Sequence, residues 1–408
     1  MRCDRDNCEY VRHSKVNNNG GTHCCLACKN GIGHGSWCEK KQILINHKHF
    51  QAHAVKRNFP SIANRTWFLP TELSKIYNFP PIPKNPPNVV VGVISFGGGL
   101  YGKIGPNNRL LSGDIITYWS NIGIPLNKQP KVFVKLVNGA RLNTPDSSTT
   151  ENTIDIETLG GCYPSPNLTI VLYIVRNSIA EFSTVLNYAL ADKIHKPSIL
   201  SISWGQPEIN YSPAQLDTIN RVFERAYNKG IIICVASGDN GSSDGTSAIQ
   251  CADFPASSPY VIAVGGTSLV SPTDSYTADT VETAWTSGGG AISDYFPIPT
   301  YQQRIASGSL KRNVPDVSSN ADPKTGVCYL INGKLHIVGG TSIAAPTIAA
   351  FFALCNKKQS LTEKLYTASN TCFHDITSGS NGYYNCKVGY DNCTGNGSIN
   401  GVNLLSNL

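Results

Sequence analysis

The sequence predicts an α/β domain with a parallel sheet flanked by helices, preceded by a small cysteine-rich N-terminal segment. Two observations predict the sheet. Near-continuous apolar runs, such as Val89–Phe96 and Leu168–Val175, recur along the chain, and stretches with helical spacing lie between them. Strands that are apolar on both faces and alternate with helices are typical of parallel sheets covered on both sides. The third observation is a group of six cysteines within the first 45 residues, which sets this segment apart from the rest.

Composition excludes several other classes of protein. Charged residues make up 15% of the 408 residues, whereas an average soluble domain has roughly 25%. A disordered polyampholyte or a long coiled coil needs many more charges. No apolar run approaches the ~20 residues of a membrane span. The first six residues are too polar for the core of a secretion signal, so the compartment stays open, although a secreted or acidic lumenal location is favoured.

The N-terminal part of the chain is predicted to comprise a module (residues 1–45) and a linker (46–65). Residues 1–65 hold 11 Lys and Arg but only 4 Asp and Glu, so the whole net charge of +7 resides there. A short cationic segment is usually solvated, and residues 66–408 are neutral without a basic stripe. We therefore expect no nucleic-acid partner and no membrane span, and we expect a monomer.

The cysteines of the module leave two interpretations open. Cys25 and Cys28, followed by His34 and Cys38, have the ligand types of a structural zinc site. Six cysteines in a short loop-rich segment fit three disulfides equally well, and the six glycosylation sequons of the chain would suit an oxidising route. Disulfides are slightly favoured over zinc.

The body of the chain (residues 66–408) begins near Trp67 and continues through a proline-rich run into its first strand, Val89–Phe96. Because ligands bind at the carboxyl ends of parallel strands, we expect active groups at that edge of the sheet. After the second strand, Leu168–Val175, the sequence predicts further elements in this order: a helix over 178–190, a strand over Ile199–Trp204, a helix over 213–229, and strands over 230–237 and 260–265.

Two segments carry residues with catalytic chemistry. The segment 339–346 reads Gly-Gly-Thr-Ser-Ile-Ala-Ala-Pro and opens an apolar helix, which places the Ser342 hydroxyl near backbone N–H groups able to stabilise an oxyanion. Glu151 and Asp155 are four residues apart, about 6 Å between Cβ atoms on one helix face. Such carboxyl groups share a proton, so the pair could accept the hydroxyl proton of Ser342. The alternatives are an ordinary N-cap serine and a solvated helix face.

A third carboxyl group, Asp239, follows an apolar strand within Ala-Ser-Gly-Asp-Asn-Gly. Taken alone it reads as a loop or Asx-turn, but a protonated Asp239 could donate to an oxyanion. The three histidines of the body, His195, His336 and His374, lack a His-Gly-Thr setting, and no Asp ends the first strand. The parts of a Ser-His-Asp triad are therefore missing.

The order Glu151, Asp155, Asp239, Ser342 resembles that of the sedolisins, or serine-carboxyl peptidases. The resemblance covers about residues 67–405 and includes Ser201-Ile-Ser-Trp-Gly205, Asp253-Phe-Pro255, Val264-Gly-Gly-Thr267, Ser287-Gly-Gly-Gly290 and Val314-Pro-Asp-Val-Ser318. It implies a subtilisin-like fold and acid peptidase activity on polypeptide substrates. It further implies that Ser342 is the nucleophile, Glu151 the general base and Asp155 its orienting partner, with Asp239 in the oxyanion hole.

The same resemblance implies binding sites for substrate and for one calcium ion. The substrate would pair with two segments, Ser203-Trp204-Gly205 and Gly288-Gly289-Gly290. Calcium would be held by oxygen atoms, which it prefers. These are the carboxylates of Asp375 and Asp391 and the backbone carbonyls of Ile376, Lys387 and Gly389. Taken alone, the two aspartates are better explained as surface residues in turns, and only the resemblance favours calcium. Cys372, Cys386 and Cys393 flank this loop and could brace it by a disulfide.

The sequence departs from the sedolisin pattern in two ways that affect the expected function. Only about 65 unrelated residues precede the body, where the family carries a long prosegment, and no acidic residue follows the Gly97–Gly99 run. We expect an endopeptidase. The alternatives are a tripeptidyl-peptidase of the same family, a neutral protease that uses His195 or His336, and an inactive protease-like scaffold that binds a partner.

Overall fold

The computed structural model describes residues 66–142, 146–305, 309–357 and 361–408, together with the backbone of residues 51–52 and 55–57. The predicted module (1–45), with its zinc and disulfide alternatives, and most of the linker (46–65) lie outside the described residues. The chain divides into two units, Met1–Gln51 and Ala52–Leu408. The fold described below is that of the second unit.

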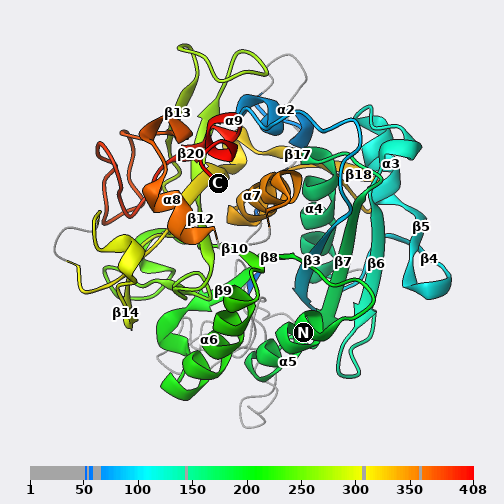
Figure 1. The fold of residues 1–408 in the computed structure, drawn as a ribbon, viewed down its shortest axis with the longest axis horizontal. Coiled ribbons are helices and arrows are strands. Elements are labelled where there is room, and N and C mark those ends of the chain that lie inside the picture. The colour runs from blue at the N-terminus through cyan, green and yellow to red at the C-terminus, as the bar shows by residue number, and fades with distance from the viewer. Residues whose placement is uncertain (1–50, 53–54, 58–65, 143–145, 306–308, 358–360) are drawn as a thin grey trace, which may run out of the picture. The chain divides into compact units, whose positions relative to one another are not determined.

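A mainly parallel sheet forms the centre of this unit (Figure 1). Among the described residues it has ten strands, in the order β19-β20-β16-β12-β10-β8-β3-β7-β6, with β13 beside β12. The pairs from β6 to β20 are parallel, as predicted, and only β13 and β19 run antiparallel to their neighbours. The strands are β3 (Val89–Phe96), β6 (Lys131–Leu136), β7 (Leu168–Val175), β8 (Ile199–Ile202), β10 (Ile232–Ala236), β12 (Ile262–Val270), β13 (Val281–Ala284), β16 (Val317–Asn320), β19 (Phe373–His374) and β20 (Ser398–Ile399).

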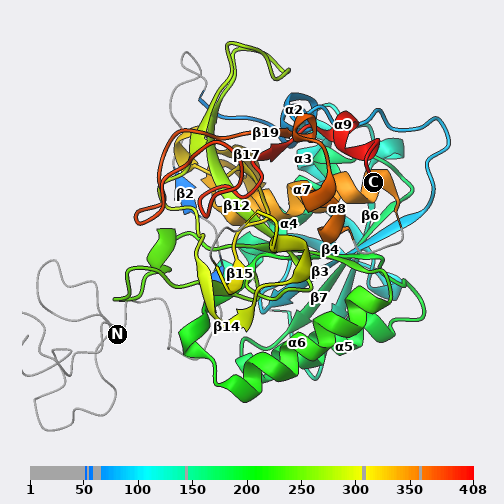
Figure 2. The ribbon, with the colours of Figure 1, turned by 60° about the vertical axis from the view of Figure 1, so that its left-hand side comes forward.

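Helices cover both faces of the sheet, which confirms the predicted α/β class. Two long helices, α4 (Ser147–Cys162) and α7 (Thr341–Cys355), contact each other on one face, and α7 also contacts β8, β10, β12 and β16. On the other face, α5 (Phe182–Ala191) and α6 (Pro213–Asn228) lie side by side (Figure 2). The remaining helices are α2 (Pro70–Ile76), α3 (Asp114–Asn121), α8 (Thr362–Thr367) and α9 (Gly401–Leu405).

Shorter strands form small sheets around this core. Strand β9 pairs with β11, β4 with β5, and β14 with β15, all antiparallel. A third strand, β2, adds antiparallel to the β17–β18 hairpin. These strands are β1 (Gln51–Ala52), β2 (Val55–Arg57), β4 (Gly102–Ile104), β5 (Leu110–Gly113), β9 (Trp204–Pro207), β11 (Asp253–Phe254), β14 (Ile292–Pro297), β15 (Lys311–Asn313), β17 (Val327–Ile331) and β18 (Lys334–Gly339).

One difference between the structure and the sequence prediction concerns the run 199–204, and another is that β12 continues to Val270, past the predicted end at residue 265. The apolar run 199–204 was expected to be continuous, but β8 ends at Ile202, and Trp204 begins β9 in a different sheet. Ser203 lies between them, and its hydroxyl donates to the carboxylate of Asp155. The Ser203 side chain is therefore directed at α4 where the chain leaves the central sheet.

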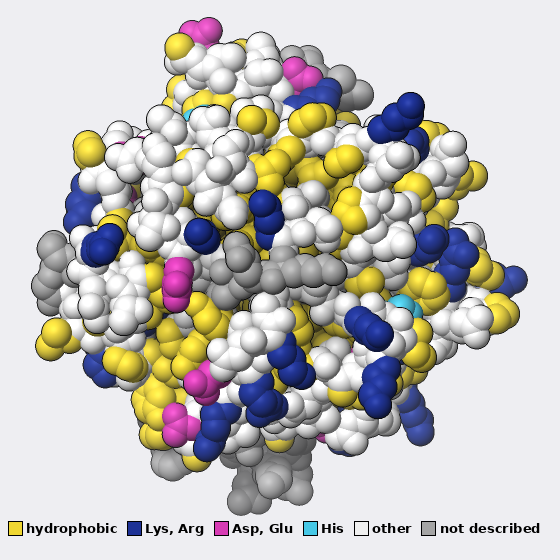
Figure 3. All heavy atoms as spheres, viewed as in Figure 1, with side chains coloured by type: hydrophobic (Ala, Val, Ile, Leu, Met, Phe, Trp, Pro, Cys, Tyr) yellow, Lys and Arg dark blue, Asp and Glu magenta, His cyan; other side chains and the backbone are white. Residues whose placement is uncertain are grey.

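None of the helices in the described part of the chain is long and apolar enough to cross a membrane. On the face shown in Figure 3, Lys and Arg side chains are scattered singly or in small groups. A polyanion site would need a concentrated basic patch.

Candidate active site

Helix α4 presents two fully buried carboxyl groups. Glu151 and Asp155 are both 0% exposed, and every residue of α4 from Ser148 to Cys162 is buried. Asp146 caps the N-terminus of the helix, and its Oδ1 accepts the N–H of Thr149 at 2.9 Å. The solvated helix face considered above is therefore wrong. A helix that is buried on all sides belongs to the core, and acidic groups there demand a specific role.

Ser342 lies in the first turn of α7, directly after β18. The connecting residue, Gly340, has a φ of +127°, which a residue with a side chain rarely adopts. Ser342 is fully buried, and its hydroxyl lowers the pKa of Glu151. The contact does not have the geometry of a regular hydrogen bond, since neither Ser342 Oγ nor a Glu151 carboxylate oxygen has such a partner among the described residues. Catalytic hydrogen bonds are often loose before substrate binds.

The carboxyl groups of this site interact strongly. Burial raises the pKa of Glu151 well above its usual range, and the charges of Asp155 and Asp239 raise it further. Burial likewise raises the pKa of Asp155, against the opposing effect of a hydrogen bond from Ser203. The structure thus places the other three predicted catalytic residues, Asp155, Asp239 and Ser342, within electrostatic reach of Glu151. The pair holds protons more tightly than isolated carboxyl groups would, so it titrates as a unit.

Asp239 is tied to the residue before the candidate nucleophile. Its Oδ1 accepts both the backbone N–H and the hydroxyl of Thr341, each at 2.8 Å. The Thr341 hydroxyl also lies 3.2 Å from the backbone N and O of Gly238. Because Oδ1 already accepts two donors, Oδ2 is the oxygen from which a protonated Asp239 would donate. Sequence reasoning missed Thr341, although it stands beside Ser342 in the same motif.

Ser203 contributes its side chain to the interior of the site. Its hydroxyl donates to Asp155 Oδ1 at 2.6 Å and lies 3.5 Å from the backbone carbonyl of Ser342. The residue is 0% exposed. Its predicted role was to pair with substrate through the backbone, so the hydroxyl contact is an additional role that the sequence did not reveal.

The two predicted substrate-binding segments lie close to these groups. Trp204 is buried, and its ring packs edge-on against Phe96 at 5.7 Å, so only the backbone of β9 is suited to pair with substrate. The glycine segment 288–290 adjoins the Asp239 loop, because Gly289 N donates to the carbonyl of Gly238 at 2.8 Å. A Cβ atom at Gly289 would lie 1.9 Å from the carbonyl oxygen of Ser237, so no side chain fits there.

A second buried carboxyl pair adjoins the site and was not predicted. Asp244 and Asp253 interact with each other, and both feel the charge of Asp239. Burial raises the pKa of Asp244 to about 8, and burial followed by the charge of Asp244 raises the pKa of Asp253 well above its usual range. A Cβ atom at Gly205 would lie 2.0 Å from Asp253 Oδ1, which explains the glycine of β9. This pair connects β9 with the Asp239 loop.

The three histidines of the body have other surroundings. His195 Nδ1 lies 2.9 Å from Asp192 Oδ2 beyond α5. His374 stacks on Tyr276 with ring centroids 3.5 Å apart, and burial lowers the pKa of this imidazole to about 4. His336 faces Tyr329 across the β17–β18 hairpin. None of the three is among the groups that shift the pKa of Glu151.

The predicted calcium ligands gather around one turn. Gly389 N donates to Asp375 Oδ2 at 2.9 Å, and Lys387 N donates to Asp391 Oδ2 at 3.1 Å. The two carboxylates therefore meet the same turn. The carbonyl oxygens of Ile376, Lys387 and Gly389 accept no hydrogen bond from another described residue. Two carboxylates and three uncommitted carbonyls match the donor set that calcium requires.

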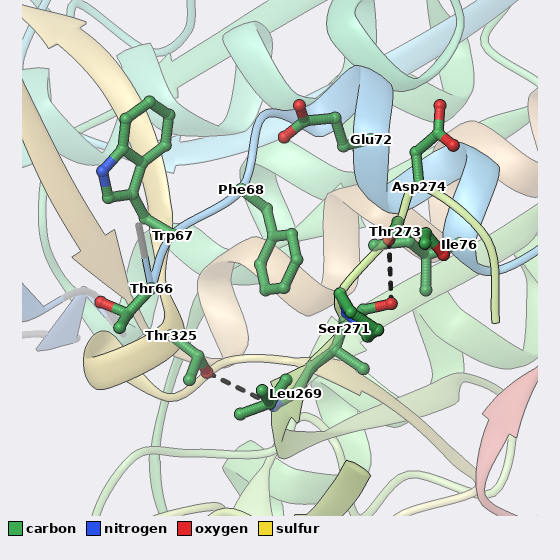
Figure 4. A pocket seen from close by; sticks show the side chains of 12 residues that line it. Thr66, Trp67, Phe68, Glu72, Ile76, Leu269, Ser271, Thr273, Asp274 and Thr325 are labelled. Carbon is green, nitrogen blue, oxygen red and sulfur yellow. Dashed lines mark hydrogen bonds between the residues drawn. The ribbon is translucent and has the colours of Figure 1, made fainter. Parts of the chain in front are cut away.

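A separate pocket lies away from these residues. It holds about 390 Å³ between α2 and the end of β12, and its walls include Trp67, Phe68 and Leu269 (Figure 4). Glu72 and Asp274 stand at its rim. No predicted catalytic, substrate-binding or calcium residue lines it.

Comparisons with known proteins agree with this fold. The model of the subtilase family matches residues 153–383. Kumamolisin from Bacillus sp. (strain MN-32) is 35% identical over 84% of this chain, and the match covers 64% of kumamolisin. Tripeptidyl-peptidase 1 from Homo sapiens is 29% identical over 47% of this chain and 38% of that protein. The structure of Pseudomonas sedolisin, a serine-carboxyl proteinase complexed with two molecules of pseudo-iodotyrostatin, superposes with a TM-score of 0.71 at 25% identity, over 84% of this chain and 98% of that chain.

The fold and the family match define a protein of the subtilase family. Within it, the chain belongs to the sedolisins, the serine-carboxyl peptidases, as its motifs predicted. The chain spans less than two thirds of the length of kumamolisin and of tripeptidyl-peptidase 1.

Proposed function

We propose that this chain is an acid-acting serine-carboxyl endopeptidase. One observation carries the proposal: two fully buried carboxyl groups, one helical turn apart on α4, meet the hydroxyl of Ser342 at the start of α7. Burying two acids costs stability, so their presence in the core indicates that they serve a function. The names and structure of the sedolisin relatives support the same reaction.

In the first step, the ionised Glu151 accepts the hydroxyl proton of Ser342 while Oγ attacks the carbonyl carbon of the scissile peptide. Asp155 holds Glu151 in position and carries the proton that the two carboxyl groups share, and Ser203 orients Asp155. The protonated Glu151 then passes its proton to the leaving amine, so that an acyl-enzyme remains. Water attacks the acyl-enzyme by the same route and regenerates Ser342.

The negative charge of the tetrahedral intermediate requires a donor, for which we propose protonated Asp239. Thr341 holds Oδ1 of this carboxyl with two hydrogen bonds, which directs Oδ2 as the donor. A carboxyl group donates only while it carries a proton, so this role restricts the reaction to acid conditions.

The strands around the site suit an extended polypeptide. The segment Val55–Arg57 lies antiparallel on β18, with Val55 opposite Gly339, three residues before Ser342. The strand that leads to the candidate nucleophile therefore accepts extended backbone as a partner. Because β17 holds the other edge of β18, a substrate strand would have to pair with the predicted segments 203–205 and 288–290.

We further propose that Asp375, Ile376, Lys387, Gly389 and Asp391 bind one calcium ion. The ion would neutralise both carboxylates and fix the turn that connects Cys386 to β20. This role is structural, and no step of peptide hydrolysis passes through the ion.

The test is cleavage of an unfolded protein substrate from about pH 3 to about pH 8. Loss of the nucleophile in Ser342→Ala is expected to lower kcat by about 10⁴-fold or more, and loss of the base in Glu151→Gln by about 10²–10⁴-fold. Glu157→Gln is the matched control, because Glu157 is equally buried on α4 but bonds the backbone N–H of Leu330. Activity near neutral pH that survives Glu151→Gln would contradict the mechanism, and mapping of the product lengths separates an endopeptidase from a tripeptidyl-peptidase.

A further inference from the structure

Two cysteines lie together at the base of the proposed calcium loop. The Sγ atoms of Cys386 and Cys393 and a carboxylate oxygen of Asp391 lie within 4.8 Å of one another. The Cys393 thiol is buried and lies 3.1 Å from the carbonyl oxygen of Tyr384. The Cys386 backbone is fixed as well, since its N–H donates to the carbonyl of Gly379 at 3.0 Å. The fold therefore brings two sulfur atoms that are seven residues apart in sequence into one small space.

The backbone between the two cysteines is held in a closed turn. Asp391 Oδ2 accepts the N–H of Lys387, and Asp391 Oδ1 accepts the N–H of both Cys393 and Thr394. The Asp391 side chain thus connects the backbone next to Cys386 with the backbone at Cys393. A cross-link between the sulfurs would make permanent a closure that these hydrogen bonds hold only reversibly.

We propose that Cys386 and Cys393 are a modification site and form a disulfide that closes the loop 386–393. A soft metal ion is the other chemistry that two thiols allow, but a structural zinc site takes four protein ligands. The cluster offers three groups. The disulfide needs no further ligand.

The reaction needs an oxidant, for which a low-molecular-weight disulfide such as oxidised glutathione suffices. The thiolate of the half-buried Cys386 attacks one sulfur of the oxidant, and one glutathione leaves as its thiolate. The thiolate of the buried Cys393 then attacks the mixed disulfide at Cys386, and the second glutathione leaves. The two cysteines lose two electrons and two protons, and the oxidant is reduced to two thiols.

The disulfide would act on the calcium site. The loop 386–393 contains Lys387, Gly389 and Asp391, three of the five proposed ligands, and this part of the inference rests on the proposed calcium site. A closed loop has fewer conformations to lose when the ion binds, so the oxidised protein should bind calcium more tightly.

The experiment starts from the reduced full-length chain, which is equilibrated with oxidised glutathione. Differential alkylation and peptide mapping by mass spectrometry then identify the linked cysteines, and calorimetric titration gives the calcium Kd of each form. We expect a Cys386–Cys393 link, and a Kd about tenfold weaker after reduction. Cys393→Ser should match the reduced wild type and should not respond to the oxidant. Cys355→Ser, a half-buried cysteine at the end of α7, should behave as wild type.

Several results would overturn the proposal. The link is refuted if both thiols stay free in oxidised glutathione, if either pairs with a different cysteine, or if purified protein carries one zinc ion that Cys393→Ser loses. Equal calcium Kd values for the linked and reduced forms refute the effect on the loop. A linked protein that binds no calcium in either form would instead refute the calcium proposal and leave the disulfide in place.

Discussion

Replacing Ser203 by alanine gives a sharp test of how the acidic pair is controlled. The Ser203 hydroxyl donates to Asp155 Oδ1 at 2.6 Å and lowers the pKa of Asp155. Alanine removes this donor but retains the backbone of the segment between β8 and β9. The pair should then hold its second proton more tightly, and a doubly protonated pair has no base to offer Ser342.

The magnitude follows from the hydrogen bond. A hydrogen bond to a charged group contributes about 1.5–3 kcal/mol, and one pKa unit corresponds to about 1.4 kcal/mol. Loss of the bond should therefore raise the apparent pKa of the pair by about one to two units. The acid limb of the kcat/KM profile should move to higher pH by the same amount, because this limb reports the free enzyme's essential base.

The assay is the pH profile of kcat/KM with a quenched fluorescent peptide, for wild type, Ser203→Ala and Ser201→Ala. Ser201 is the matched control, since it is equally buried on β8 and its hydroxyl has no hydrogen-bond partner among the described residues. Ser201→Ala should leave the acid limb in place. An unshifted acid limb in a folded Ser203→Ala protein would refute the argument, as would an equal shift in both variants.

Three further predictions concern Thr341, Asp244 and Asp391. Thr341→Val removes one of the two hydrogen bonds to Asp239, so steady-state kinetics should show kcat about tenfold lower with KM little changed; an unaltered kcat would contradict the role of Thr341. Asp244 has a folded-state pKa of about 8, above its unfolded value, so its contribution to stability is present at acid pH and is lost as pH rises through about 8. Asp244→Asn, at a φ of +47° that asparagine tolerates, should raise Tm near pH 9 and not near pH 4; the opposite order in thermal melts would refute the assignment. Calcium chelation should lower Tm by several degrees, and Asp391→Ala should abolish the dependence of Tm on calcium; a calcium effect that persists in this variant would place the ion elsewhere.

The sheet could be predicted from the sequence because its strands are buried on both faces. Such strands are mostly apolar, and β3 and β7 have the predicted bounds. The break at Ser203 could not be predicted in this way. A serine at the end of an apolar run does not by itself indicate where a strand ends. The contact of Ser203 with Asp155, 48 residues earlier in the chain, exists only in the folded structure.

The proposed catalytic set could be predicted from the order of the four residues in the sequence, but the buried environment of these residues could not. Glu151 and Asp155 have the spacing of a solvated helix face, and only the packing of α4 against α7 and the sheet buries them. Asp244 and Asp253 were missed for the same reason. They stand nine residues apart in a loop, and their interaction exists only because the strand β11 returns beside β9.

The proton on Asp239 would serve two purposes in the proposed mechanism. The charge of ionised Asp239 raises the pKa of Glu151, so a protonated Asp239 makes Glu151 easier to ionise. The same proton that allows Asp239 to donate to the oxyanion thus helps Glu151 to act as a base at low pH. Ser203 acts in the same direction through Asp155, since its hydrogen bond favours the ionised pair. Acid activity then requires no acidic residue after the Gly97–Gly99 run, because neutral Asp239 and Ser203 together offset the cost of keeping one buried carboxylate ionised.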